Sequence, residues 1–159
     1  MATVGIRAKA DKALKNWVKN SDQHFRNVIR AAVDSIGNAA ATRAQANAPI
    51  DTGDLRAHIR AGKVREVGDS AEIFVEADMP YALKMHEQLT PYGRFQLGPL
   101  SRVQPMTREG GVGGKYLSRA IEQNIKLWER VLGDTVKQNM GGAVKSTQVT
   151  VGPIRQPLP

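Results

Sequence analysis

The chain has 159 residues, a length suited to one domain with a single hydrophobic core, and no apolar run approaches the ~18 residues of a membrane span. It contains no cysteine, which excludes disulfides, thiolate metal sites and a thiol nucleophile. Lysine and arginine total 23 against 15 aspartate and glutamate, and the net charge of +8 favours nucleic acid, an anionic membrane or an acidic protein as partner.

Residues 6–18 predict a short basic amphipathic helix, so we expect residues 1–20 to form a basic N-terminal helix or arm. The apolar face of this helix comprises Ile6, Ala10, Leu14, Trp17 and Val18, and lysines occupy much of the opposite face. A solvated basic face is the expected role, and contact with nucleic acid or a membrane is the alternative.

A long helix is predicted from Ser21 or Asp22, either of which can cap it, to the residues before Pro49. Gly37 lies inside this helix and weakens it by ~1 kcal/mol relative to alanine, which predicts a close approach by a neighbouring element. The apolar positions recur with a period near 3.6 and are Phe25, Val28, Ile29, Ala32, Val33, Ile36, Ala39 and Ala40.

Residues 48–56 predict a shaped turn between this helix and the strands that follow. Pro49 disfavours helix at the preceding residue, Asp51 and Thr52 can bond the backbone, and Gly53 can adopt a positive φ. Residues 55–67 and 71–76 then alternate in polarity around Gly68-Asp69-Ser70, which predicts an antiparallel hairpin. Basic side chains of its first strand would oppose acidic ones of its second.

A helical piece of one to two turns is predicted over residues 81–87. Residues 88–114 are rich in glycine and proline, and we expect a mobile loop there, with Gly110–Lys115 as a flexible hinge. One long helix is predicted from Lys115 to Gly141, with Leu117 on its apolar stripe. Residues 148–151 read as a strand at a sheet edge, and Gly152-Pro153 begins an extended tail.

The predicted fold class is therefore α+β, with two long helices packed on a small antiparallel sheet, a long loop and extended tails. We expect residues 21–140 to form the core and residues 141–159 to form the C-terminal strand and tail.

No constellation in the sequence predicts catalysis or a cofactor. His24, His58 and His86 have no metal-ligand spacing, and Asp51 and Asp54 offer too few oxygens for calcium. His86 and Glu87 beside Tyr81 invite an acid–base hypothesis, but adjacent helical residues point about a third of a turn apart, so we expect no dyad. The glycine-rich segment before Lys115 lacks the Walker spacing. Nearby bases are candidate contacts to DNA or an acidic partner, namely Arg94, Arg102, Arg108 and Lys115.

Two segments in this order resemble the gene-product-ten-like family of long-tailed phages. They are Ala-Pro-x-Asp-Thr-Gly-x-Leu-Arg at residues 48–56 and Tyr-Ala-x-x-x-His-Glu at residues 81–87, and the resemblance covers roughly residues 25–138. Here Gln88-Leu89-Thr90 follows Glu87, where many relatives have Gly-Thr. The motif positions, which the resemblance implies to be scaffold or subunit contacts, are Pro49, Asp51, Thr52, Gly53, Leu55, Arg56, Tyr81, Ala82, His86, Glu87 and Leu117.

The resemblance implies a structural virion protein without catalytic activity. It implies a ring subunit of six copies in the head-to-tail connector or tail-completion layer, made in the host cytoplasm. The implied partners are head-completion or stopper, tail-terminator and tail-tube proteins, with packaged DNA in the lumen as a further candidate. A small basic DNA-binding protein is the first alternative, and a hydrolase or nuclease using His86 and Glu87 is the second.

Overall fold

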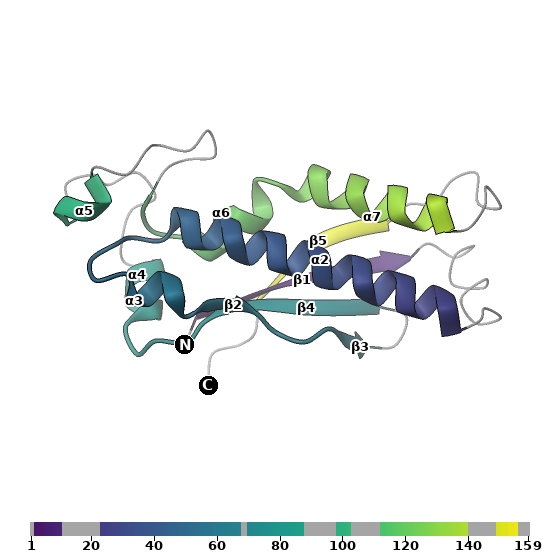
Figure 1. Cartoon of the computed structure of the whole chain (residues 1–159), viewed down its shortest axis with the longest axis horizontal. Coiled ribbons are helices and arrows are strands. Elements are labelled where there is room, and N and C mark those ends of the chain that lie inside the picture. The colour runs from purple at the N-terminus through teal and green to yellow at the C-terminus, as the bar shows by residue number, and fades with distance from the viewer. Residues whose placement is uncertain are drawn as a thin grey trace.

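A computed structural model describes residues 2–10, 23–67, 70–87, 98–102, 112–139 and 149–155. The fold is α+β, as predicted, with helices packed along one face of an antiparallel sheet of order β2-β4-β1-β5, in which β3 also pairs with β4 (Figure 1). The strands are β1 (Ala2–Ala10), β2 (Ile59–Ala61), β3 (Arg65–Val67), β4 (Ser70–Ala77) and β5 (Val149–Arg155). The helices are α2 (Gln23–Asn47), α3 (Asp54–Ala57), α4 (Ala82–Glu87), α5 (Pro99–Arg102), α6 (Tyr116–Glu122) and α7 (Ile125–Asn139).

Helix α2 crosses the sheet and confirms the longest predicted helix. Its buried face carries Val33, Ile36 and Ala40, whereas Ala39, expected on the same face, is exposed. The close approach predicted at Gly37 is confirmed, because a Cβ there would lie 2.3 Å from Ile73 Cδ1 of β4. The capping residues Ser21 and Asp22 lie outside the described residues.

The predicted N-terminal helix is wrong for the described residues, because Ala2–Ala10 form strand β1. β1 pairs with β4 from Ala2 opposite Ala77 to Lys9 opposite Ser70, and with β5 on its other side. Val4 and Ile6 are buried, whereas Thr3 and Arg7 are half-buried. The apolar residues of this segment therefore fit the two-residue period of a strand as well as the period of a helix. Because this segment pairs with β4 on one side and β5 on the other, it forms a strand and not a helix.

The predicted hairpin is confirmed, but its first strand is shorter and interrupted. Residues 54–57 form α3, β2 starts at Ile59, and residues 62–64 separate β2 from β3. The expected cross-strand attraction joins Arg60 Nε to Glu76 Oε1 at 3.2 Å. Glu72 lies opposite Arg65 but is bound by Arg7 Nε of β1 at 2.5 Å, while the Arg65 guanidinium lies over the Phe74 ring.

The single long helix predicted after Lys115 is wrong, because α6 and α7 are separated at Gln123 and Asn124. Asn124 is buried, its Nδ2 donates to Ala120 O at 3.2 Å, and its carbonyl accepts from Trp128 N at 3.0 Å. The Asn124 side chain thus caps the end of α6, and the Asn124 backbone carbonyl accepts a hydrogen bond from the first turn of α7. The C-terminal edge strand is confirmed, but it continues through Gly152 and Pro153 to Arg155.

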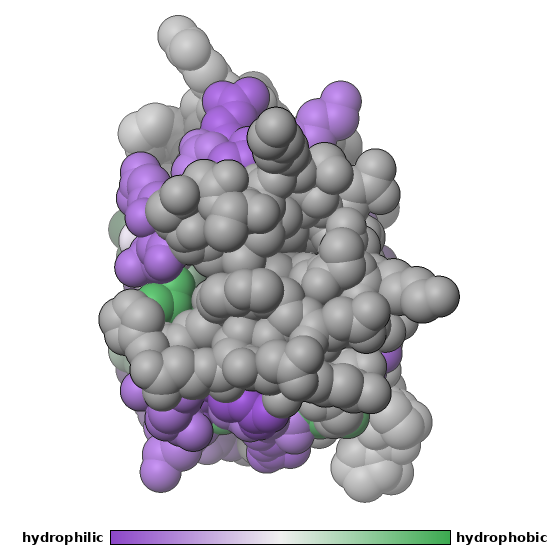
Figure 2. All heavy atoms as spheres, turned by 90° about the vertical axis from the view of Figure 1, so that its right-hand side faces the viewer, coloured by the Kyte–Doolittle hydropathy of each residue, from purple (hydrophilic) through white to green (hydrophobic). Residues whose placement is uncertain are grey.

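The two ends of the long axis differ in structure. Helices α3, α4 and α5 gather at one end, whereas β3 and the start of α2 lie at the other (Figure 1). Figure 2 views the molecule from the end with β3 and the start of α2, and the described side chains in view there are mostly hydrophilic. Arg26 and Arg30 of α2 lie 3.7 and 3.6 Å from the Glu66 carboxylate of β3. None of the helices in the described ranges combines the length and apolar character needed to cross a bilayer.

Candidate functional site

The turn between α2 and α3 has the features predicted for Thr52 and Gly53. Gly53 has φ 97°, a conformation that side chains rarely adopt, and it immediately precedes α3. Thr52 Oγ1 donates to Asp54 Oδ2 at 2.6 Å and lies 3.4 Å from the Asp54 amide nitrogen. The turn is therefore fixed by its own side chains as well as by backbone conformation.

Arg56 holds the end of α2 against α3. Its Nε and Nη2 donate to Ala48 O at 2.9 and 2.8 Å, and Nη2 also donates to Ala46 O at 3.2 Å. Partial burial lowers the pKa of this guanidinium below its ordinary value, but an arginine remains charged. The cation satisfies carbonyls that the helix itself leaves without partners.

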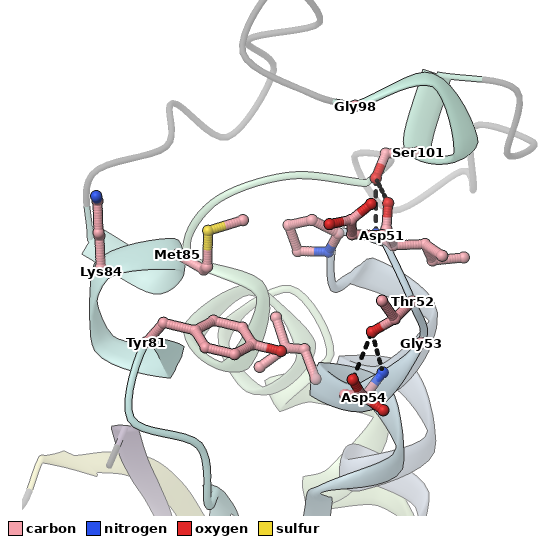
Figure 3. A pocket seen from close by; sticks show the side chains of 12 residues that line it. Asp51, Thr52, Gly53, Asp54, Tyr81, Lys84, Met85, Gly98 and Ser101 are labelled. Atoms are coloured by element: carbon pink, nitrogen blue, oxygen red, sulfur yellow. Dashed lines mark hydrogen bonds between the residues drawn. The ribbon is translucent and has the colours of Figure 1, made fainter.

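Residues 49–55 face Tyr81, Lys84 and Met85 across one cavity of about 570 Å³ (Figure 3). We call it the junction pocket. Tyr81 and Met85 come from one side, and Asp51, Thr52 and Asp54 come from the other. Its lining residues are Pro49, Ile50, Asp51, Thr52, Gly53, Asp54, Leu55, Tyr81, Lys84, Met85, Gly98 and Ser101. The two motif segments, distant in sequence, thus build a single site.

A part of the predicted loop closes one side of the junction pocket. Residues 99–102 form helix α5, and Ser101 is buried. Its Oγ accepts from Ile50 N at 2.6 Å and donates to Ile50 O at 2.7 Å. The prediction of a mobile loop over residues 88–114 is therefore wrong at residues 99–102, which form a helix. Ser101 supplies the two hydrogen bonds that a neighbouring strand would otherwise give to the backbone of Ile50. Residues 88–97 and 103–111 lie outside the described part.

His86 and Glu87, expected not to form a pair, are hydrogen-bonded. His86 Nδ1 lies 2.8 Å from Glu87 Oε1, and the Ser118 amide donates to His86 Nε2 over 3.5 Å. Because that donor makes Nε2 an acceptor, Nδ1 carries the proton and donates to the carboxylate. The side chains bend toward each other at the end of α4, which the ideal helix angle did not anticipate.

Lys115 joins this group and is not available as a free cation. Its Nζ donates to Glu87 Oε2, and its amide donates to His86 O at 2.8 Å. The bond from Lys115, supplemented by His86, holds the pKa of the Glu87 carboxyl below its usual range despite a smaller opposing effect of burial. Of the other candidate DNA contacts, Arg94 and Arg108 and the side chain of Arg102 lie outside the described residues.

The predicted hinge at Gly110–Lys115 is wrong for its described residues. Val112, Gly113 and Gly114 are buried. Gly113 N donates to Asn47 O at 3.0 Å, and Arg119 Nε donates to Gly114 O at 3.0 Å. The segment is thus tied to the end of α2 and to α6.

The remaining motif residues lie in the core. Leu55, Ala82 and Leu117 are buried, and Tyr116 Oη donates to Ala82 O at 3.1 Å. Burial raises the pKa of the Tyr116 phenol well above its ordinary value. The Tyr116 ring also meets the His86 ring edge-on at 5.2 Å. These positions support the junction pocket and do not line it, except Leu55.

Ser118, His86 and Glu87 form a hydrogen-bonded series that resembles a catalytic triad in order. Ser118 Oγ lies 3.4 Å from His86 Nε2, but Ser118 and His86 are only 3% and 4% exposed. Neither residue lines the junction pocket, so a substrate has no path to the serine oxygen there. Within the described residues no cluster of His, Asp and Glu could hold a metal ion.

Sequence reasoning missed Ser101, Tyr116 and Ser118 as contributors to the site. Ser101 stands in a segment without periodicity, so no local pattern marks it. Tyr116 and Ser118 flank Leu117 in a helix start that was predicted, and their contacts to α4 depend on tertiary packing.

Residues 8–96 match the family described as "Bacteriophage HK97-gp10, putative tail-component". That range is more than half of the chain and contains both motif segments. No curated protein matches the chain.

The solved structures with low-level similarity include two of a bacterial tRNA(His) guanylyltransferase (Thg1)-like protein. The complex with GTP gives a TM-score of 0.42 at 8% identity over 98% of this chain, and the complex with ATP gives 0.39 at 10% identity over 99%. This chain spans 50% of each of those chains.

Proposed function

Because the chain belongs to the HK97-gp10-like family of bacteriophage tail components, we propose that it is a ring-forming subunit of the head-to-tail connector or tail-completion layer. In this role it is a structural protein of the virion that joins the portal apparatus of the capsid to the tail tube. We propose six copies per ring, with head-completion or stopper and tail-terminator or tail-tube proteins as neighbours.

The observation that supports this function best is the convergence of the two motif segments on the junction pocket. Both segments lie within residues 8–96, where the family model matches, and they line one cavity at one end of the molecule. Their polar atoms hold turns and elements in place, as Arg56 and Glu87 illustrate. A site of this kind serves recognition of a partner better than it serves chemistry.

The sheet offers surfaces through which subunits can join. β5 occupies one edge, and β2 and β3 occupy the other. An edge strand has unpaired backbone groups that a neighbouring chain can use. Contacts between two different surfaces of identical subunits close into a ring when the rotation between them permits.

Mass measurement and electron microscopy test the proposal. We expect light scattering on the purified protein to give a multiple of the subunit mass, and negative-stain images to show rings with a central opening. Antibody labelling of phage particles should place the protein between head and tail. A protein that stays monomeric at high concentration and is absent from particles would contradict the proposal.

A small basic DNA-binding protein is the alternative, favoured by the net charge of +8. Several described cations are engaged by carboxylates, among them Arg7, Arg60 and Lys115, which lowers the charge free to meet phosphates. The alternative predicts binding to duplex DNA with an affinity that falls steeply between 50 and 200 mM salt, by about tenfold or more. Fluorescence anisotropy with labelled duplex DNA measures this, and absent or salt-independent binding removes it.

A further inference from the structure

We propose that the junction pocket of one copy of this chain binds the opposite end of a second copy, where β3 lies beside the start of α2. This contact rests on the proposed ring assembly and names the partner that the pocket takes. The docking surface, which we call the basic end, comprises Arg26 and Arg30 of α2 and Arg65, Glu66 and Val67 of β3.

Exposed apolar side chains gather around the junction pocket. Tyr81 lines the cavity and is 40% exposed, and Met85 lies next to it on the same side (Figure 3). Leu100 belongs to α5, which closes one side of the pocket, and is 52% exposed. Covering large apolar side chains with a partner removes them from water and is therefore favourable.

The lining of the pocket carries an excess of negative charge. Asp51 and Asp54 are exposed carboxylates, and Lys84 is the cation of the lining. Among the described residues none binds the Asp51 carboxylate, whereas Asp54 accepts from Thr52 Oγ1. In a chain of net charge +8, a local negative charge of this kind favours a basic surface of a second copy.

The basic end has the complementary composition. Arg26 Nη1 and Arg30 Nη1 lie 3.7 and 3.6 Å from the Glu66 carboxylate, so two cations share one anion. These side chains are exposed, and exposed ion pairs contribute little in water, so an arginine can turn to a carboxylate of another chain at small cost. Val67 follows Glu66 and is 51% exposed, which adds an apolar side chain to the cations.

The position and shape of the basic end suit a contact between successive copies. It lies at the opposite end of the long axis from the junction pocket (Figure 1). Among the described strands β3 pairs with β4 alone, and all three of its residues are exposed. Two strands about 4.8 Å apart can enter a concave site more easily than the side of a helix about 10 Å across. Two different surfaces at opposite ends let each copy bind the next, which is the arrangement that closes a ring.

Engineered cysteines test the contact directly, because the chain has none of its own. A variant with both Val67→Cys and Tyr81→Cys should give a ladder of disulfide-linked multimers on mild oxidation, since each copy offers one cysteine to each neighbour. Either substitution alone should leave monomers in a denaturing gel. The matched control combines Tyr81→Cys with Leu127→Cys, because Leu127 is an exposed apolar residue of α7 outside the basic end. A ladder from the control alone, or dimers from either single variant, would overturn the inference.

Charge reversal tests whether the contact joins two different surfaces. Asp51→Arg should disable the pocket, and Arg26→Glu with Arg30→Glu should disable the basic end, each weakening self-association by about tenfold or more. Mixed in equal amounts, the two variants should form a 1:1 dimer that grows no further, because one intact pocket and one intact basic end remain. Arg130→Glu, on the exposed side of α7, is the control and should assemble as the parent does. Sedimentation velocity measures all four samples, and a mixture without dimers would overturn the inference.

Assembly of the wild-type chain separates this inference from the proposed function. If rings form in the wild type and equally in the charge-reversal variants, the function stands and the contact is refuted. If the ladder and the mixed dimer form as expected but the wild type gives open filaments and particles lack the protein, the contact stands and the ring function is refuted. A wild-type chain that stays monomeric, with no ladder from the paired cysteines, refutes both.

Discussion

Gly37 is a single residue on which the packing of helix against sheet depends. Glycine costs α2 ~1 kcal/mol of helix propensity relative to alanine, but it lets the helix backbone approach β4. The nearest atoms to a Cβ at this position would be Ile73 Cδ1 at 2.3 Å and Cγ1 at 2.9 Å. Ile73 is fully buried, so it has little room to move aside.

We predict that Gly37→Ala destabilises the protein, because overpacking costs ~1–3 kcal/mol and exceeds the gain in helix propensity. Gly133→Ala in α7 is the control, since a Cβ there meets nothing within 4 Å, and it should stabilise by ~0.5–1 kcal/mol. Urea denaturation measures both. Adding Ile73→Val, which removes the closest carbon, should recover part of the loss at Gly37, and equal effects of the two glycine substitutions would contradict the packing argument.

Glu87 gives a pH dependence at the residue scale. Its pKa in the folded state is lowered, chiefly by the bond from Lys115. The stabilisation is therefore complete above the unfolded pKa of about 4.3 and is lost as pH falls through the folded value. We predict that in Glu87→Gln the free energy of unfolding falls less between pH 7 and pH 3 than in the parent. The difference should be on the order of 0.5–1 kcal/mol, because the carboxylate is partly exposed. Denaturation experiments between pH 3 and pH 7 measure this difference. Lys115→Met, which removes the partner of the carboxylate, should reduce the pH dependence in the same way.

At the scale of elements, the junction between α2 and α3 depends on one cation. Arg56 places two N–H groups on Ala48 O, and Ala48 is fully buried. Removing the guanidinium leaves that carbonyl with fewer partners where water does not readily replace them.

We predict that Arg56→Ala costs ~1–3 kcal/mol, and that Arg56→Lys recovers only part because lysine lacks the planar fork. Arg60→Ala is the control: its side chain is 63% exposed in its ion pairs, so the loss should be ~0–1 kcal/mol. Guanidinium denaturation compares the three. A loss at Arg60 as large as that at Arg56 would show that charge, and not carbonyl bonding, dominates.

At the scale of the whole molecule, the sheet order determines which strands are protected. β4 and β1 are the inner strands, whereas β2, β3 and β5 lie at the edges. All three residues of β3 are exposed, while Val4, Ile6, Ile73 and Val75 belong to the core.

We therefore predict the slowest amide exchange in β4 and the described residues of β1, and faster exchange in β3. Hydrogen–deuterium exchange with mass spectrometry measures this in the intact protein. An N-terminal segment that exchanges as rapidly as β3 would contradict its place inside the sheet.

The sequence by itself determined the features that depend on neighbours along the chain. The period of α2, the chemistry of Thr52 and Gly53 and the β3–β4 hairpin follow from local geometry, and the order of the two motif segments indicated the family. α4 was also predicted, although its length is only about a turn and a half.

Only the tertiary structure decided the features that depend on distant partners. Ile6 suits a helix or a strand, and pairing with β4 and β5 selects the strand. The apolar stripe continues past Asn124, so the break between α6 and α7 follows from the bonds of a buried amide. Ser101 binds Ile50 across 51 residues, and no local pattern reports a contact that exists only when the chain is folded.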